Sequence, residues 1–508
     1  MTNLNPYADE RYISLEASFE LIDVDAADTA NTTGSEGTFF SKIEQTHDKI
    51  TAMSKRVATL EPGEWVLDGG YSCISENEDN EEVGYWSKVL SDENGNIDIT
   101  LEFTFETPQD SKAFTVIFDD TTNNCASDFE LKVYNSNGDL IGTETVTGNE
   151  SSVVIVNVEA ENYTKLVAHF TKTNKPHRHL RICEIVFGYL KIFNDDEIVS
   201  VSLEFESSID SQNLPSKKLV LTIDNTDRRY NIISPTGIYK YLQKGQGLNV
   251  SIFINGERTI MGRFYFDTSK SNDNSMTAQI TGYDRLYFLD NIECNIGTTG
   301  TWTVFEAVEA VINVSKLPIT YEIPENIGNR NINKWIPQNT SIREALRLIA
   351  QAAMSVCYIN RLDVLVFKEP GLGEYTDSLD NDRMSQYPEV TDTGLINSVE
   401  ITSRNEYEEG SEEIKYTASN IQPDEDEKIL SINNPLVNSQ DVAQWLLKMS
   451  AYRIEYDISE RGNPEREVQD IINIHDVYGE NKNAVVLTQQ FEASIGLSGK
   501  VKAVTNNA

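Results

Sequence analysis

The sequence has few of the features that mark a membrane or disulfide-linked protein. Within its 508 residues there is no run of about eighteen apolar residues, so we expect no membrane span. The start, MTNLNPYADERY, lacks the basic end and apolar core of a secretory signal, which predicts a protein kept in the cytoplasm of the cell that makes it. The five cysteines show no CxxC spacing, so we expect buried free thiols rather than a disulfide framework or a structural zinc site.

Positive charge is also scarce. Lysine and arginine number 42 against 81 acidic residues, which gives a formal net charge of −39. A surface of this sign repels phosphate backbones, so we expect no nucleic-acid binding. The acidic runs Glu76–Glu82 and Glu406–Lys428 are typical of solvated loops, and the charge favours solubility of a long chain.

Motifs of catalysis and cofactor binding are missing as well. There is no phosphate-binding glycine loop, no GxSxG, no HExxH and no cysteine placed with a histidine as in cell-wall cysteine peptidases. The segment Asp92–Asp98 has the alternating oxygen ligands of a calcium loop, but its glycine is at the fourth position rather than the sixth and no glutamate closes the loop at the twelfth, which favours a turn. We therefore expect no enzyme, no catalytic residue, no metal and no cofactor.

The most informative stretch is Ile198–Asp290. Val199, Val201, Leu203 and Phe205 fall on every second residue, which places them on one face of a strand. Further alternating segments follow, and the Asn255-Gly256 pair between two of them predicts a tight hairpin. Five or six such strands in about ninety residues are typical of a small antiparallel barrel or sandwich.

Four phrases in this stretch carry a resemblance: LVLTIDNTDRRYN, GIYKYLQKGQGLNVSIFINGE, MGRFYFDTSKS and QITGYDRLYFLD. Together they resemble the baseplate hub or tail-tip proteins of bacteriophages and phage-derived contractile particles of Gram-positive bacteria. Near the C-terminus, RGNP followed by QDIINIHD resembles the closing barrel of the same family. The resemblance implies two similar barrels per subunit, a homotrimer that closes the tail tube, and tail-tube and baseplate proteins as partners.

Residues 64–190 form a second all-β region. Short strands, turns such as Asn137-Gly138 and the order FELKVYNSNGDLIGT, YTKLVAHF, RICEIVFGYL resemble discoidin-like and carbohydrate-binding jelly rolls. Aromatic faces often stack on sugar rings, although they also fill sandwich cores. The candidate glycan-binding residues are Trp65, Tyr71, Tyr85 and Trp86, with His177 and His179 of KPHRHL. These histidines have no acidic neighbour at a metal-ligand spacing, which favours an exposed loop.

Helices are expected in three places. One runs from Ile43 to Leu60, before Pro62-Gly63, and another covers Thr301–Val314. The run SIRE at Ser341 predicts a capping box and a helix with Leu346 buried, followed by a hairpin over Tyr358–Lys368. A helix over Ser439–Ile454 has Ser439 as its cap.

The fold class that we predict is mainly β with α+β parts, in several domains: small antiparallel barrels of the phage hub type plus a jelly-roll-like β-sandwich. The N-terminal strands and helix either join the first barrel or stand beside it. The expected divisions are 1–63 for this segment, 64–190 for the sandwich, 191–295 for the first barrel, 296–394 for an α/β middle domain and 395–508 for the closing barrel with one helix.

The predicted function is structural: a trimeric hub or tail tip at the distal end of a phage or phage-like tail, assembled in the bacterial cytoplasm. The alternative is a surface adhesin or receptor-binding protein whose sandwich binds host cell-wall glycan. The sequence leaves open whether the tail is contractile and whether the particle is a phage or a bacteriocin.

Overall fold

A computed structural model describes most of the chain. The described residues are 11–22, 26, 29–34, 37–38, 41–47, 58–59, 61–64, 83–119, 122–228, 230, 244–272, 274–317, 319–407, 410–422, 426–475 and 481–506. The chain forms two compact units, Met1–Ser18 with Ile192–Ala508 and, inserted between them in the sequence, Phe19–Lys191. The finer domain division expected from the sequence stays a prediction.

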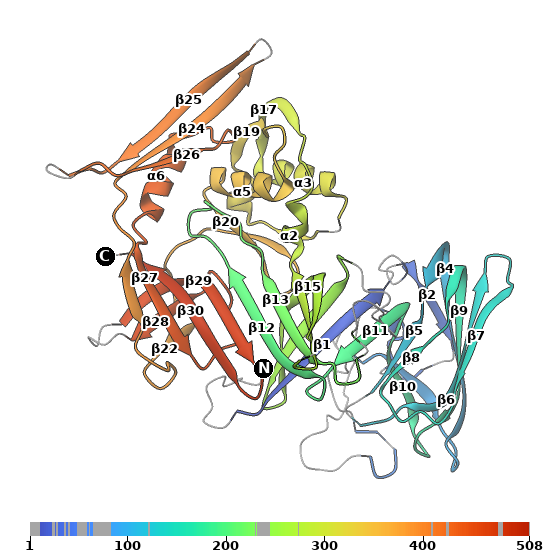
Figure 1. The fold of residues 1–508 in the computed structure, drawn as a ribbon. Coiled ribbons are helices and arrows are strands. Elements are labelled where there is room, and N and C mark those ends of the chain that lie inside the picture. The colour runs from blue at the N-terminus through green and yellow to red at the C-terminus, as the bar shows by residue number, and fades with distance from the viewer. Residues whose placement is uncertain are drawn as a thin grey trace. The chain divides into compact units, whose positions relative to one another are not determined.

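A sheet of 13 strands dominates the fold (Figure 1), which confirms the predicted mainly β class. Its main path runs β11-β1-β14-β15-β16-β13-β12-β29-β30-β27-β23, and β28 pairs with both β29 and β22. The strands are β1 (Ile13–Ile22), β11 (Gly188–Phe193), β12 (Ile198–Glu206), β13 (Lys218–Asp224), β14 (Gly247–Ile254), β15 (Glu257–Asn272), β16 (Thr277–Tyr283), β22 (Asp377–Leu379), β23 (Glu389–Asp392), β27 (Ile454–Glu460), β28 (Ile471–His475), β29 (Asn481–Ala493) and β30 (Leu497–Thr505).

The hairpin between β14 and β15 follows the sequence closely. Ile254 pairs with Glu257, and the two residues between them have positive φ, 54° at Asn255 and 86° at Gly256. Asparagine and glycine tolerate this left-handed conformation, which suits the twist of the flanking strands. The predicted hairpin is confirmed.

The predicted apolar face of β12 needs one correction. Val201, Leu203 and Phe205 are buried, but Val199 is 47% exposed and Ile198 is buried instead. The register with β13 shifts between Ile198 and Ser200, so a bulge moves the alternation by one residue.

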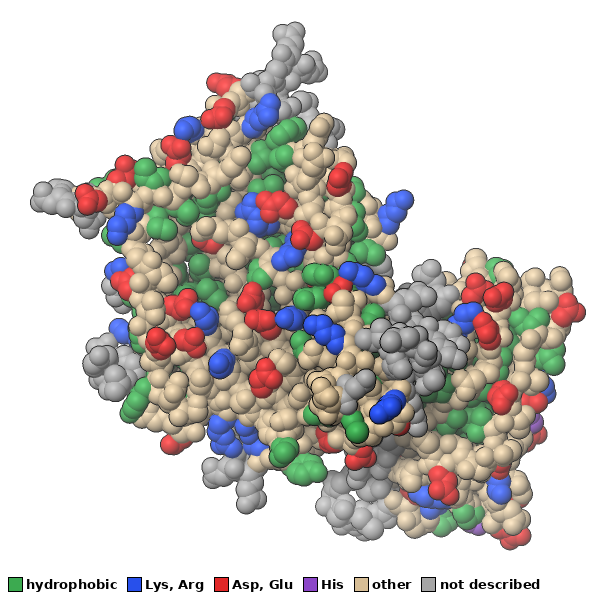
Figure 2. Space-filling view, in the orientation of Figure 1, with side chains coloured by type: hydrophobic (Ala, Val, Ile, Leu, Met, Phe, Trp, Pro, Cys, Tyr) green, Lys and Arg blue, Asp and Glu red, His purple; other side chains and the backbone are tan. Residues whose placement is uncertain are grey.

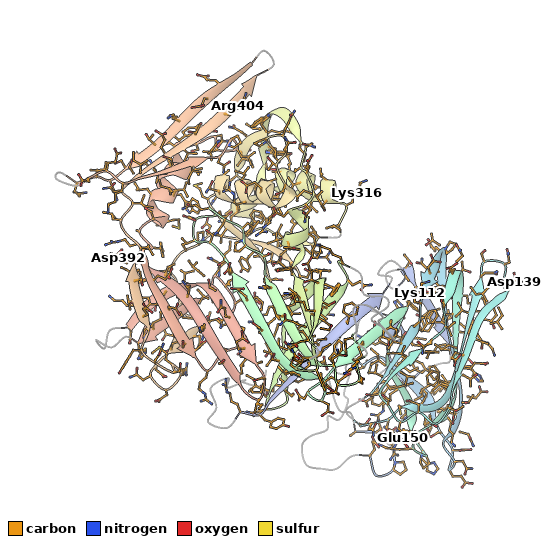
Figure 3. All side chains as sticks on the ribbon, viewed as in Figure 1. Lys112, Asp139, Glu150, Lys316, Asp392 and Arg404 are labelled. Atoms are coloured by element: carbon orange, nitrogen blue, oxygen red, sulfur yellow. The ribbon has the colours of Figure 1, made fainter. Side chains whose placement is uncertain are left out.

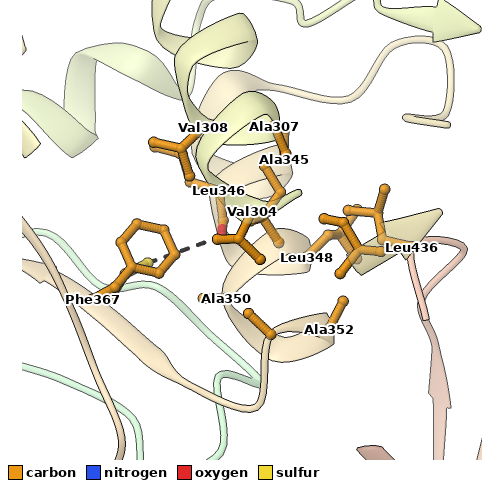
Figure 4. Close-up of a cluster of buried hydrophobic side chains, with 14 of the residues drawn as sticks. Val304, Ala307, Val308, Ala345, Leu346, Leu348, Ala350, Ala352, Phe367 and Leu436 are labelled. Carbon is orange, nitrogen blue, oxygen red and sulfur yellow. Dashed lines mark hydrogen bonds between the residues drawn. The ribbon is translucent and has the colours of Figure 1, made fainter. Parts of the chain in front are cut away.

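The middle of the chain surrounds two helices, α3 (Val304–Ser315) and α5 (Ile342–Ala352) (Figure 4). Leu346 and Val308 belong to their common core, and both are fully buried. The remaining elements here are α2 (Arg285–Leu289), β17 (Gly297–Thr303), β18 (Tyr321–Glu322), α4 (Glu325–Gly328), β19 (Asn331–Trp335), β20 (Val356–Ile359) and β21 (Leu365–Lys368). The pairing of β20 with β21 forms the predicted hairpin.

Capping in this region differs from the sequence prediction. The Ser341 hydroxyl accepts a hydrogen bond from the Glu344 amide, as expected of a cap. The Glu344 carboxylate, however, pairs with Arg347, so the predicted reciprocal bond of a capping box is not the one made. A complete capping box occurs at α3, between Thr303 and Glu306.

A three-stranded sheet and α6 (Gln440–Met449) contribute to the same core. The sheet contains β24 (Ser398–Tyr407), β25 (Gly410–Ser419) and β26 (Ile429–Asn433), in the order β25-β24-β26. Ile401 of β24 and Leu446 of α6 belong to the cluster built around α3 and α5. Ser439 caps α6, as predicted, through a bond from the Asp441 amide.

The inserted unit is a sandwich of two sheets, ordered β2-β4-β9-β6-β7 and β3-β10-β5-β8. Its strands are β2 (Asn31–Gly34), β3 (Tyr85–Leu90), β4 (Asn96–Ser111), β5 (Phe114–Phe118), β6 (Ala126–Asn135), β7 (Leu140–Val146), β8 (Val153–Val156), β9 (Ala160–Thr173) and β10 (His179–Val186). Aromatic side chains fill the space between the sheets; Phe105, for example, meets both Tyr163 and Phe187 edge to face. The jelly-roll-like sandwich of the prediction is thus present.

The N-terminal segment contributes one strand to the large sheet and one to the sandwich. β1 is a neighbour of β14 in the large sheet, whereas β2 pairs with β4 of the sandwich. The helix expected from Ile43 to Leu60 begins as a short 3-10 turn, Ile43–His47, and most of its remainder lies outside the described residues. Within the described part of the chain no helix is long and apolar enough to cross a membrane.

Candidate functional site

The predicted aromatic residues do not form a surface in the described sandwich. Trp65 and Tyr71 lie outside the described residues. Tyr85 and Trp86, on β3, are 0% and 1% exposed. Burial raises the pKa of the Tyr85 hydroxyl to about 12. These two rings serve the core, because a sugar can stack only on an accessible ring face.

The two predicted histidines lie in different settings, one in a loop and one at the start of a strand. His177 lies in the loop before β10 with a positive φ of 55°. His179 begins β10, where its Nδ1 is 2.7 Å from the Ser87 carbonyl oxygen and its amide donates to Glu61 Oε1 at 2.8 Å. Burial lowers the pKa of His179, so this ring favours the neutral form. Its contacts fix the loop against the sandwich edge.

A buried charge cluster that the sequence did not reveal lies beside these residues. The Arg181 guanidinium, 4.0 Å above the Trp86 ring, donates to Asp119 Oδ2 at 2.8 Å and also pairs with Glu61. All three charged side chains are at most 2% exposed. Stacking together with paired hydrogen bonds offsets the desolvation of the guanidinium. The cluster anchors the segment at Glu61 to the sandwich.

The outer face of the larger sandwich sheet carries a shallow hollow of about 440 Å³. It is lined by polar side chains of β4, β6 and β9, including Asp128, Glu130, His169 and Lys172. His169 Nε2 lies 2.9 Å from Asp98 Oδ1. The hollow can accept and donate hydrogen bonds. No group of three metal-ligating side chains was found among the residues that the structure describes.

The first unit contains an internal repeat. The strands β12–β16, here called the first repeat, pair in the order β12-β13-β16-β15-β14. The strands β23 and β27–β30, the second repeat, pair in the order β23-β27-β30-β29-β28. Every pairing in both orders is antiparallel. Taken along the chain, each strand of one repeat therefore has one counterpart in the other.

The correspondence extends to single residues. Tyr265 of β15 pairs with Gly247 on one side and Tyr283 on the other. Val485 of β29 pairs in the same way with Ile471 and Val504. One residue further on, both strands have a register shift against the following strand, after Phe266 in β15 and after Val486 in β29. A bulge at the same position of two sheets fixes their alignment without ambiguity.

Backbone hydrogen bonds around the bulge repeat too. The Phe266 amide donates to the Gln246 carbonyl, and the Gly245 amide donates to the Phe266 carbonyl, both at 2.8 Å. In the second repeat the Val486 amide donates to the Asp470 carbonyl at 2.9 Å. The Gln469 amide donates to the Val486 carbonyl at 2.7 Å. The two repeats thus share backbone geometry where their side chains differ.

Within the chain, β12 pairs with the second half of β29 and so joins the two repeats. We call this half, Thr488–Ala493, the outer half of β29. Leu203 pairs with Phe491 and Phe205 with Gln489, in an antiparallel register that runs from Val201 to Glu206. All four of these side chains are buried. On the other face, Gln490 donates to Glu204 Oε1 at 3.0 Å. We call this pairing the internal joint (Figure 1).

Each repeat also holds buried charge. In the first, Lys217 lies with its Nζ 5.1 Å from the centroid of the Phe205 ring, and its amide donates to Asp284 Oδ2. Burial lowers the pKa of Lys217 to about 8 and raises that of Asp284 to about 6. In the second, Arg466 donates to Glu460 Oε1 at 2.6 Å and also pairs with Asp377. These groups hold loops to the strands.

Charge on the surface is distributed rather than gathered. Figure 2 shows acidic side chains spread over the face in view, with basic ones between them. Several basic side chains form ion pairs with acidic neighbours, such as Lys415 with Glu400 and Lys502 with Glu455, both at 2.9 Å. Exposed pairs of this kind contribute little to stability.

The chain has distant similarity to several solved structures. No protein-family model and no curated protein sequence matches the chain. The solved tail protein from Neisseria meningitidis MC58 is 12% identical with a TM-score of 0.45, and the match covers 62% of this chain and 94% of that one. The 43 kDa tail protein of prophage MuSo2 from Shewanella oneidensis is 15% identical with a TM-score of 0.44, over 62% and 95% of the two chains. Prophage tail protein gp18 from Listeria monocytogenes EGD-e is 10% identical with a TM-score of 0.43, over 63% and 91%.

Proposed function

We propose that this chain is a structural component of a phage or phage-like tail, in which three copies form a ring at the hub or tail tip. The observation that carries the proposal is the internal repeat of β12–β16 and β23 with β27–β30. Three copies of a chain with two like repeats present six like units around an axis. Such a ring matches a tube of sixfold symmetry, which it closes and connects to the baseplate.

The sequence resemblance to tail hubs of Gram-positive hosts supports the same proposal. The phrases that carry it fall on the repeats. MGRFYFDTSKS spans most of β15, and QDIINIHD contains β28. The resembled family therefore shares with this chain the strands on which the repeat is built.

The role proposed is mechanical rather than enzymatic. Buried charged groups such as Arg181 and Arg466 are bound to carboxylates and hold loops in place. Paired charges of this kind stabilise one arrangement of the chain. The ring would bear load, close the tube before use and open on contact with the host.

The oligomeric state and the partner test the proposal together. The purified full chain is measured by mass photometry and sedimentation over a range of concentrations, alone and with tail-tube protein from the same particle. We expect trimers, and binding of the trimer to one end of the tube in negative-stain images. A chain that remains a monomer in all of these conditions, or that binds along the sides of the tube, contradicts the proposal.

A second candidate function concerns the sandwich alone. The polar hollow lined by Glu130, His169 and Lys172 offers hydrogen-bond donors and acceptors on an open sheet face, which suits a cell-wall glycan. The full chain is titrated with purified cell-wall polysaccharide and its fragments, and the variants Glu130→Gln and His169→Ala are titrated beside it. Saturable binding that both variants weaken supports an adhesin role. Equal binding by all three proteins removes the hollow as the site.

A further inference from the structure

Two strand edges of the first unit have no strand partner among the described residues. One is the outer edge of β23, which ends the path of the large sheet. The other is the outer half of β15, from Thr268 to Asn272, which pairs only with β16. Open edges present unpaired N–H and C=O groups and are natural sites of strand addition.

The internal repeat assigns these edges to each other. β23 occupies in the second repeat the place that β12 has in the first, and the outer half of β15 corresponds to the outer half of β29. Within the chain, β12 and β29 pair with each other at the internal joint. The two open edges are therefore the two halves of a second, identical joint.

We propose that β23 of one copy pairs antiparallel with the outer half of β15 of the next copy and so reproduces the internal joint between chains. This inference rests on the proposed ring, to which it adds the contact and the register. The register is fixed in two steps. Leu203 of β12 pairs with Leu219 of β13, and Val390 of β23 pairs with Tyr456 of β27. Leu219 and Tyr456 are equivalent in the two repeats, so Leu203 and Val390 are equivalent too. Counting from the shared bulge then makes Ser271 equivalent to Phe491.

The pairs that follow from the register of the internal joint are Glu389 with Asn272, Val390 with Ser271, Thr391 with Lys270 and Asp392 with Ser269. Lys270 would lie across from Thr391 and diagonally from Glu389, which is within reach of an ion pair. Asp392, labelled in Figure 3, is held at the end of β23 by Arg453 at 2.6 Å.

Exposure of the equivalent residues agrees with a missing partner at this place. Leu203 is 1% exposed, whereas its counterpart Val390 is 52% exposed. Phe491 is fully buried, whereas its counterpart Ser271 is exposed. Before the bulge the burial of the two strands is alike: Tyr265 and Phe266 are buried, as are Val485 and Val486. The repeats thus diverge at the point where one has a neighbouring strand and the other does not.

A second copy of the chain is the partner that this geometry favours. The two edges differ, so a contact between them is heterologous, and repeating it leads from each copy to the next. Within the proposed ring the internal joint and the joint between copies alternate.

Paired cysteines in the full chain test the register. Val390→Cys with Ser271→Cys, and Asp392→Cys with Ser269→Cys, place thiols directly opposite each other between copies. Val390→Cys with Ser269→Cys is the matched control, shifted by two residues on the same face, where the Cβ atoms lie too far apart for a disulfide. Each variant is assembled, oxidised or treated with a short thiol crosslinker, and run on a denaturing gel beside its single-cysteine parents.

We expect covalent dimers and trimers from both opposed pairs and at least tenfold less from the shifted control. A trimer that crosslinks equally in all three variants, or in none, overturns the proposed pairing while the ring itself stands. A chain that stays a monomer overturns both the pairing and the proposed function. The native cysteines do not confuse the test, because the single-cysteine parents carry the same background.

Discussion

Phe205 and Phe491 meet edge to face across the internal joint, with ring centroids 6.1 Å apart and planes at 78°. Their strands come from residues almost three hundred positions apart in the sequence, so this contact closes one repeat on the other. At the places equivalent to Phe205 and Phe491, the open edges of β23 and β15 have an aspartate, Asp392, and a serine, Ser271. An apolar joint is suited to a permanent contact, and a polar one to a contact that must first be exposed to water.

Reversal of charge at Lys270 should weaken the contact between copies. In Lys270→Glu a carboxylate faces Thr391 and lies diagonally from Glu389, which costs about 1 kcal/mol per joint, or roughly fivefold in its dissociation constant. Sedimentation equilibrium measures the change. Restoration of assembly by Glu389→Lys in the same chain is expected. Lys500→Glu, on an exposed position of β30, is the control and should leave assembly unchanged.

Removal of the Arg181 guanidinium should destabilise the sandwich. Arg181→Met leaves Glu61 and Asp119 buried without their cation, which costs about 3–5 kcal/mol. Arg181→Lys keeps the charge but loses the planar stack on Trp86. Its stability should therefore lie between that of the parent and that of Arg181→Met. Thermal unfolding followed by tryptophan fluorescence measures both. Equal stability of the methionine variant and the parent would show that the cluster does not hold the fold.

The helix α5 should matter for folding of the middle region. Leu346 is fully buried, so Leu346→Ala should cost about 2–5 kcal/mol, and Ser341→Ala should cost about 1 kcal/mol through loss of the cap. Leu362→Ala, at a residue that is 71% exposed, is the control. An unchanged melting temperature of Leu346→Ala together with lost assembly would instead make α5 an interface element.

The stability of the first repeat should depend on pH through Lys217. Burial lowers its pKa from 10.5 to about 8, so below pH 8 the folded chain bears the full penalty of a buried ammonium, on the order of 3 kcal/mol. Between pH 8 and 10.5 the unfolded chain binds more protons, so this penalty disappears as pH rises. Lys217→Met should therefore be more stable than the parent at pH 7, and the difference should shrink by pH 10. Chemical denaturation at both pH values measures it; a constant difference contradicts the assignment.

The inserted sandwich should be dispensable for assembly. We expect a chain in which residues 23–187 are replaced by a flexible linker to keep β1 and β11 in the large sheet and to remain trimeric. The reason is that the first unit has its own core and its own strand pairing. Circular dichroism and sedimentation are the measurements. Aggregation of the shortened chain would mean that the sandwich is needed for the core.

Local signals in the sequence predicted local structure well. Asn255-Gly256 specified its hairpin because both residues tolerate positive φ, and Ser439 specified the start of α6 because its hydroxyl satisfies a free amide. The capping box predicted from SIRE was half right. Ser341 caps the helix, but the Glu344 carboxylate pairs with Arg347 on the same helix face instead of accepting a hydrogen bond from the Ser341 amide. The four-residue motif does not include Arg347, so it could not predict that this residue would compete for the Glu344 carboxylate.

The long-range features could not be predicted from residues alone. Tyr265, Phe266 and Asp267 correspond to Val485, Val486 and Leu487, so the repeat is preserved in pairing and almost unrecognisable in side chains. The sandwich showed the same limit. Trp86 could be expected either on a surface or in the core, and its burial depends on Arg181, nearly a hundred residues away.

Two insertions, the sandwich and the segment with β24–β26 and α6, make the two repeats differ. The sandwich precedes β12 in the chain, and β24–β26 with α6 lie between β23 and β27, where the first repeat has only the loop from Ser207 to Lys217. Each insertion occurs once per chain, so a ring of three would present three sandwiches for six repeats. A ligand of the sandwich would then be bound with a valency of three, and weak individual contacts would add up to strong attachment.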